Sequence, residues 1–220
     1  TTFGSALHIN DTPALEDSVL VDKLRSAGCV VLGKTNTPEF GHKGKTDNLP
    51  FGVTKNPWNL EYSPGGSSGG TSAAIAAGII PLGTGSDGGG SIRIPSALCG
   101  LSGIKTSQGR IPIGGKVPPG SGLLTVKGPM ARTTIDTTLA LDATIGSHPS
   151  DIFSLESHST NWRDQLQAGN LPKTVIWSPT MGFSTVDKEI LSICEQAIQT
   201  LGDAGVTIIE KDIIWDQNPV

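Results

Sequence analysis

Residues 63–95 read SPGGSSGG (63–70), TSAAIAAGIIPL (71–82) and GTGSDGGGSIRIP (83–95). Two glycine-rich loops flank a short apolar segment, and each loop carries a serine. Glycine costs conformational entropy to order, so two such clusters require a structural reason. Tight turns are one reason. We favour another, that the backbone of both loops approaches a ligand closely and directs its N–H groups at negative charge.

The residues beside these loops predict regular structure. Alanine-rich residues 71–77 favour a helix that packs closely on a sheet, and residues 79–82 begin a strand leading into the second loop. Another helix is expected over residues 91–98. The first N–H groups of a helix lack intrahelical partners, so a helix start behind a glycine loop can bind an anion.

Helices and strands alternate along the rest of the chain, which is typical of an α/β fold. Apolar spacing and capping residues predict helices at 13–27, 133–145 and 187–201. Short apolar runs predict strands at 29–32, 103–106, 175–177 and 206–209. We expect loops at 36–62, 108–127 and 151–170, where glycine, proline or polar residues are frequent.

Composition excludes several classes of function. The 220 residues carry a net charge of −4 without a long basic run, which argues against nucleic acid as a partner. The longest apolar stretch, 73–82, is interrupted by Gly78 and Pro81 and is too short to span a bilayer. Three scattered cysteines indicate neither a disulfide framework nor a zinc site. We therefore expect a soluble, cytoplasmic protein with no cofactor, no metal and no membrane partner.

Residues 28–35, GCVVLGKT, match the phosphate-loop pattern G-x-x-x-x-G-K-[ST]. That mechanism requires a strand before the first glycine and a helix after the Lys-Thr pair. Here the predicted helix comes before the pattern and the predicted strand lies inside it, so we do not interpret it as a nucleotide site.

Residues 66–70, GSSGG, also match the G-x-S-x-G nucleophile elbow of α/β-hydrolases, with Ser68 as nucleophile. The elbow needs a strand directly before it, and residues 56–64 hold two prolines and two asparagines. A late histidine base would have to be His148 or His158. An esterase that uses Ser68 remains an alternative.

Taken together, GGSSGG, DGGGSIRIP, GKTNTPEFG (33–41) and GPMART (128–133) resemble the amidase signature family of serine amide hydrolases. The resemblance implies one large mixed, largely parallel sheet covered by helices on both faces. It also implies that Ser91 is the nucleophile and Ser67 the bridging serine, joined to it by a proton relay. The two serines are 24 residues apart, as in the family's pattern.

The resemblance implies a specific chemistry. Ser67 takes the proton of Ser91 and passes it to a neutral lysine, whose pKa must be depressed from about 10.4. An acyl-enzyme forms on Ser91 and water hydrolyses it. Backbone N–H groups of Gly88, Gly89, Gly90 and Ser91 are expected to form the oxyanion hole. Ser68, Asp87 and Arg93 are expected to support it, the last two as an ion pair that holds the loop.

The family's catalytic lysine lies upstream of a Thr-Thr-x-Gly-Ser stretch, which here is Thr1–Ser5. We therefore expect residues 1–220 to be a single amidase-signature domain fragment, truncated at both ends and inactive in isolation. The resemblance also implies a cis peptide bond between Gly66 and Ser67.

The expected partner is a small-molecule amide, and a homodimer is possible. One branch of the family amidates misacylated glutamyl-tRNA and typically shows Arg-Gln-Pro after the nucleophile. This chain has Arg93-Ile94-Pro95, which favours a general amidase. A non-catalytic scaffold or subunit is the contrasting alternative.

Overall fold

The computed structural model describes residues 1–114, 124–157 and 161–217. The described residues divide into two compact units, residues 1–167 and residues 168–220. The elements of the first unit are η1 (Ala6–His8), α1 (Val19–Ser26), η2 (Glu39–Gly41), β1 (Asp47–Asn48), β2 (Gly52–Val53), α2 (Gly69–Ala76), β3 (Leu82–Asp87), α3 (Arg93–Cys99), β4 (Ser102–Gly103), β5 (Val126–Ala131), α4 (Thr134–Thr144) and α5 (Trp162–Gln167).

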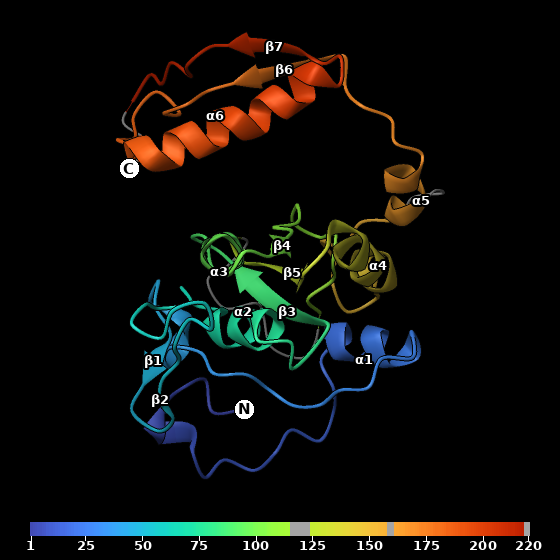
Figure 1. Ribbon diagram of the computed structural model, residues 1–220. Coiled ribbons are helices and arrows are strands. Elements are labelled where there is room, and N and C mark those ends of the chain that lie inside the picture. The colour runs from blue at the N-terminus through green and yellow to red at the C-terminus, as the bar shows by residue number, and fades with distance from the viewer. Residues whose placement is uncertain (115–123, 158–160, 218–220) are drawn as a thin grey trace. The chain divides into compact units, whose positions relative to one another are not determined.

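The centre of the first unit is a three-stranded sheet in the order β3-β5-β4 (Figure 1). All of its pairings are antiparallel. The β3–β5 ladder runs from Leu82 opposite Ala131 to Asp87 opposite Val126. The ladder therefore ends where the second glycine loop begins.

Helix α2 contacts β3 and carries the first glycine loop at its start. Ile75 of α2, Ile92 and Met130 of β5 form a buried cluster. A second cluster joins α1 and α4 through Leu20, Leu24 and Leu141, with Ile111. Burying each such side chain stabilises the fold by about 1.5–3 kcal/mol. The first cluster includes Ile92, which directly follows Ser91, and Ile75 of the helix that follows the first loop.

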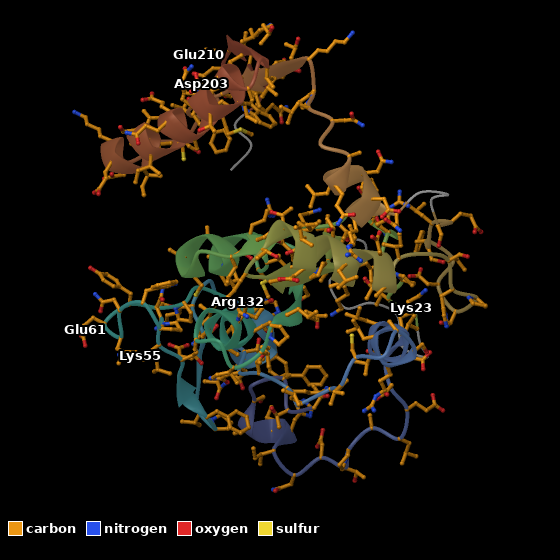
Figure 2. The ribbon with its side chains drawn as sticks, turned by 45° about the vertical axis from the view of Figure 1, so that its right-hand side comes forward. Lys23, Lys55, Glu61, Arg132, Asp203 and Glu210 are labelled. Carbon is orange, nitrogen blue, oxygen red and sulfur yellow. The ribbon has the colours of Figure 1, made fainter. Side chains whose placement is uncertain are left out.

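Two side chains labelled in Figure 2 donate hydrogen bonds to carbonyl groups at or just after the C-terminal ends of helices. Arg132 donates to the carbonyls of Ile75 and Ile80, at 3.0 and 3.2 Å, at the end of α2. Lys23 of α1 donates to the carbonyl of Ile145, just after α4, at 3.0 Å. Cations suit this position because the last carbonyls of a helix lack partners and carry partial negative charge.

The second unit contains β6 (Thr174–Trp177), α6 (Lys188–Asp203) and β7 (Thr207–Glu210). Strands β6 and β7 pair in parallel. Asp187 caps α6 by accepting a hydrogen bond from the N–H of Glu189 at 2.8 Å. The predictions at 175–177, 187–201 and 206–209 are confirmed to within a few residues.

Several other sequence predictions are confirmed or corrected by the first unit. The helices at 71–77, 91–98 and 133–145 are confirmed as α2, α3 and α4, and the first predicted helix is shortened to α1. The prediction of a strand at 29–32 is wrong. Val30 and Leu32 are exposed, and no described strand pairs with them. A buried strand needs hydrogen-bonding neighbours, and this segment has none among the described strands.

The strand expected at 79–82 is instead β3, which runs through the residues interpreted as loop. β5 was not expected, and α5 lies inside a segment expected to be irregular. β1 and β2 form a small antiparallel pair inside the loop expected at 36–62. Part of the loop expected at 108–127 lies outside the described residues.

The expected fold class is confirmed in its coarse form, because helices and strands are mixed along the chain. The finer statement, a largely parallel sheet covered on both faces, is not confirmed. The central sheet is antiparallel because β5 returns alongside β3 and pairs with β4 on its other edge. That residues 1–220 form one domain fragment stays a prediction.

Candidate active site

The two serine loops are hydrogen-bonded to each other. The backbone N–H of Ser68 donates to the carbonyl oxygen of Ser91 at 3.2 Å. The Ser68 hydroxyl also accepts a hydrogen bond from the N–H of Ser86 at 3.3 Å and lies 3.5 Å from the Ser86 carbonyl. Two loops that are far apart in the sequence are thus held side by side at the end of β3.

The first loop, residues 65–70, is held by close backbone contacts. The N–H of Gly70 donates to the Asn36 carbonyl at 3.2 Å, and a side chain on Gly70 would collide with the Asn36 backbone. The Thr46 hydroxyl donates to the Gly65 carbonyl at 2.9 Å. Glycine is required at Gly70 because the two backbones touch.

Ser67, the proposed bridging serine, is buried beside the η2 turn. Its carbonyl accepts a hydrogen bond from the Thr37 hydroxyl at 3.1 Å. A side chain on Gly41 of η2 would lie 3.5 Å from the Ser67 hydroxyl oxygen. The peptide bond from Gly66 to Ser67 is cis, as the resemblance implied.

The carboxylate of Asp87 accepts the hydrogen bonds that hold the second loop in place. Its carboxylate is fully buried and accepts backbone hydrogen bonds from Gly90 at 2.8 Å and Ile92 at 3.1 Å. Arg93 completes the set through its backbone N–H at 3.3 Å and through Nε and Nη2 at 3.0 and 2.9 Å. This is a bidentate guanidinium–carboxylate pair, which combines charge with fixed geometry.

These contacts decide the protonation state of Asp87. Burial favours the neutral acid and by itself raises the pKa. The hydrogen bonds from the Arg93 side chain and from the N–H groups of Ile92, Gly90 and Arg93 outweigh burial and lower the pKa of Asp87 to about 2. The same pairing raises the pKa of Arg93. Both groups are therefore charged at neutral pH, and the loop from 87 to 93 closes around the carboxylate.

The glycine row of the second loop contains both engaged and free donors. The N–H of Gly90 is bound to Asp87, so it is not free to meet a substrate oxygen. Within the described residues, the N–H groups of Gly88, Gly89 and Ser91 have no such partner. Gly88 and Gly89 are exposed, whereas Gly90 is buried. Of the four N–H groups expected to form an oxyanion hole, that of Gly90 is thus already bound to Asp87, and the role of the other three stays a prediction.

Neither the Ser68 hydroxyl nor the Thr71 hydroxyl caps helix α2. Ser68 is the N-cap residue of α2, yet its side chain makes no capping bond and binds Ser86 instead. Thr71 donates to the Thr84 carbonyl at 3.2 Å and contacts the Thr35 hydroxyl at 2.7 Å. Both side chains therefore tie α2 to β3 and hold the first loop against the second.

Three lysines of the described residues make contacts that do not involve the serine hydroxyls. Lys43 and Lys45 are exposed and pair with Asp47 at 2.9 and 2.6 Å. Lys34 contacts the hydroxyl of Thr1. Lys127 of β5 is the lysine whose pKa is lowered, first by burial and then by the nearby charge of Lys34. Lys127 pairs with Ser86 across the ladder, so the side chains of both lie on the same face of the sheet. Ser68 lies against Gly85, the neighbour of Ser86, and therefore on the opposite face.

The nucleophile-elbow arrangement is not favoured. No described strand enters the first loop before Ser68. The imidazole of His148 is engaged with Ser150 at 2.8 Å, in a loop near the end of α4. Within the described residues no group of three or more His, Cys, Asp or Glu side chains is placed to hold a metal ion. The same part of the chain contains no helix long and apolar enough to cross a membrane.

Known proteins resemble this chain along nearly its whole length. The family model described as Amidase matches residues 1–216. An acylamidase of Rhodococcus erythropolis is 44% identical over 218 residues, which are 98% of this chain and 45% of that protein. A glutamyl-tRNA(Gln) amidotransferase subunit of Roseiflexus castenholzii is 39% identical over 211 residues, which are 96% of this chain and 42% of that protein.

Solved structures agree. A bacterial aryl acylamidase of the amidase signature family superposes with a TM-score of 0.87 at 32% identity, over 96% of this chain and 44% of that one. A 6-aminohexanoate cyclic dimer hydrolase superposes with a TM-score of 0.83 at 34% identity, over 90% of this chain and 42% of that one. The chain belongs to the amidase signature family. It spans about half the length of the relatives it matches.

Sequence reasoning missed some residues that shape the site. Thr125 lies against Gly88 and Asn36 lies under Gly70, and both come from segments interpreted as loop. β3 itself carried a usable signal, because Gly83-Thr84-Gly85-Ser86 alternates small and hydroxyl residues with the period of a strand. No local signal identified Thr125, because its position depends on pairing between β3 and β5.

Proposed function

We propose that the protein carrying this chain hydrolyses a carboxylic amide through an acyl-enzyme on Ser91. In this proposal Ser67 takes the proton of Ser91 and passes it to a neutral lysine, which the family pattern places upstream of Thr1. The freed alkoxide attacks the amide carbonyl, the amine leaves with a proton, and water then releases the acid.

One observation supports the assignment above the others. The Ser68 N–H to Ser91 carbonyl bond holds the nucleophile's loop against the loop that carries Ser67. The Asp87–Arg93 pair closes the second loop, and among the described residues the N–H groups of Gly88, Gly89 and Ser91 have no hydrogen-bond partner. Each donor aimed at a developing oxyanion lowers the barrier by about 3 kcal/mol.

The proposal extends to the class of substrate. We favour a small-molecule amide and a general amidase, because the acylamidase relative is similar along nearly the whole chain and Ile94 stands where the tRNA-dependent branch has glutamine. The amidotransferase relative is also similar along nearly the whole chain, so a role inside a multisubunit complex is the second candidate.

The experiment is active-site labelling of the full-length protein with a fluorophosphonate probe. Ser91→Ala should abolish labelling and turnover of acetyl p-nitroanilide while the thermal unfolding temperature stays unchanged. Ser67→Ala should lower both by at least about 100-fold, the scale of a lost proton-transfer group. Ser68→Ala should keep measurable labelling.

Three results would count against the proposal. Full labelling in Ser91→Ala would remove the nucleophile assignment. Labelling lost only in Ser68→Ala would favour the esterase elbow instead. A protein that folds and never labels would favour a non-catalytic subunit.

A further inference from the structure

The three glycines of the second loop differ in what surrounds them. A side chain on Gly90 would lie 2.7 Å from Cδ1 of Ile94, and one on Gly88 would lie 2.9 Å from the hydroxyl oxygen of Thr125. A side chain on Gly89 would meet no atom within 4 Å. The space beside Gly89 is therefore open, and it is bounded by Thr125 at Gly88 and by Ile94 at Gly90.

The sheet register explains why Thr125 reaches this position. The β3–β5 ladder ends with Asp87 opposite Val126. The next residues outward are Gly88 and Thr125, one step beyond the last pair, so Thr125 stands across from Gly88. Thr125 is only partly buried. Because Gly88 has no side chain, the Thr125 hydroxyl occupies the space beside the row.

The Thr125 hydroxyl is not used to hold the fold. Within the described part of the chain it has no hydrogen-bond partner, unlike the Thr106 hydroxyl, which donates to the Lys127 carbonyl at 2.8 Å. A threonine that supported β5 would be expected to bind a neighbouring carbonyl in the same way. Thr125 instead places its hydroxyl beside the exposed Gly88.

We propose that Thr125 is a specificity-determining residue, forming the wall against which one group flanking the scissile carbonyl must fit. This inference rests on the proposed function, because it takes the N–H groups of Gly88, Gly89 and Ser91 as the site of the carbonyl oxygen. With the oxygen on that row, the groups on either side of the carbonyl extend along the loop. Thr125 then limits the size of the group on the Gly88 side.

The test compares substrate series in the full-length protein. The acyl series is acetyl, butyryl and hexanoyl p-nitroanilide, and the amine series is acetyl p-nitroanilide against acetyl aminonaphthalene. Thr125→Ala should raise kcat/KM for the larger member relative to the smaller by about tenfold in one series. One methylene group in a pocket typically changes discrimination by about 10- to 200-fold. Thr125→Val keeps the volume and should preserve the wild-type ratio within about threefold.

Fluorophosphonate labelling separates this inference from the proposed function. Labelling of Ser91 should be retained in every Thr125 variant and in Thr174→Ala, an exposed threonine of β6 that serves as control. A shift in either series supports the inference and identifies which group faces Thr125. Unchanged ratios in both series, or an equal loss for all substrates, would overturn it. Loss of labelling in the unmodified protein would instead contradict the proposed function.

Discussion

The backbone N–H of Ser68 donates to the carbonyl oxygen of Ser91 at 3.2 Å, and this bond joins the two glycine loops. Neither serine uses its hydroxyl for the bond. The Ser68 hydroxyl binds Ser86, so Ser68 fastens the first loop both to β3 and to the second loop. Within the described residues the Ser91 hydroxyl has no hydrogen-bond partner, while its backbone carbonyl is held by Ser68.

The Asp87 carboxylate should make stability depend on pH in the acid range. Its pKa falls from 3.8 to about 2 on folding, so the folded state favours the ionised form. The resulting stabilisation, about 2 kcal/mol, is fully present above pH 4 and is lost as the pH falls from about 4 to about 2. We expect Asp87→Asn to flatten that limb of urea-derived stability against pH. Asp164→Asn, at an exposed position in the first turn of α5, is the control and should leave that limb in place.

Gly70→Ala should destabilise the fold by about 1–3 kcal/mol, the range for forcing atoms into a packed site. The added methyl group would meet the Asn36 backbone, which cannot move without breaking its bond to Gly70. Gly33→Ala is the matched control, because nothing lies within 4 Å of a side chain there. Equal urea midpoints for the two variants would contradict the packing argument.

Ser96→Ala should stabilise the protein by about 1 kcal/mol. Ser96 is 5% exposed, and within the described part of the chain its buried hydroxyl oxygen has no hydrogen-bond partner. Removing an unsatisfied buried hydroxyl recovers its desolvation cost, about 1–3 kcal/mol, less some lost packing. Thr46→Val removes a hydroxyl that binds the Gly65 carbonyl, and it should destabilise by a similar amount. Thermal unfolding of both variants shows whether the signs are opposite.

Cys194 and Cys99 should react with Ellman's reagent at distinct rates. Cys194 on α6 is exposed and should react first, whereas Cys99 is fully buried. Burial raises the pKa of the Cys99 thiol, against a hydrogen bond with Ser72 that lowers it, so both access and thiolate content are reduced. We expect Cys99 to react only when the first unit unfolds, with a rate that follows the urea transition. Rapid modification in native buffer would contradict this burial.

The sequence by itself identified the two serine loops, their spacing and the helices that follow them. These are local features, since glycine clusters, small-residue helices and caps act over a few residues. The motifs around Ser67 and Ser91 were enough to place the chain in its family. The Asp87–Arg93 pair was also visible, because its partners are six residues apart.

Tertiary structure alone decided three things. It turned β3 and β5 antiparallel, engaged the Gly90 N–H with Asp87, and brought Thr125 against Gly88. The first and the third depend on pairing between segments distant in the sequence, and no local propensity reports such a pairing. Residues 29–32 show that a local pattern can also predict a strand that does not form. Their apolar run favours a strand, but a strand forms only where a neighbouring strand completes its hydrogen bonds.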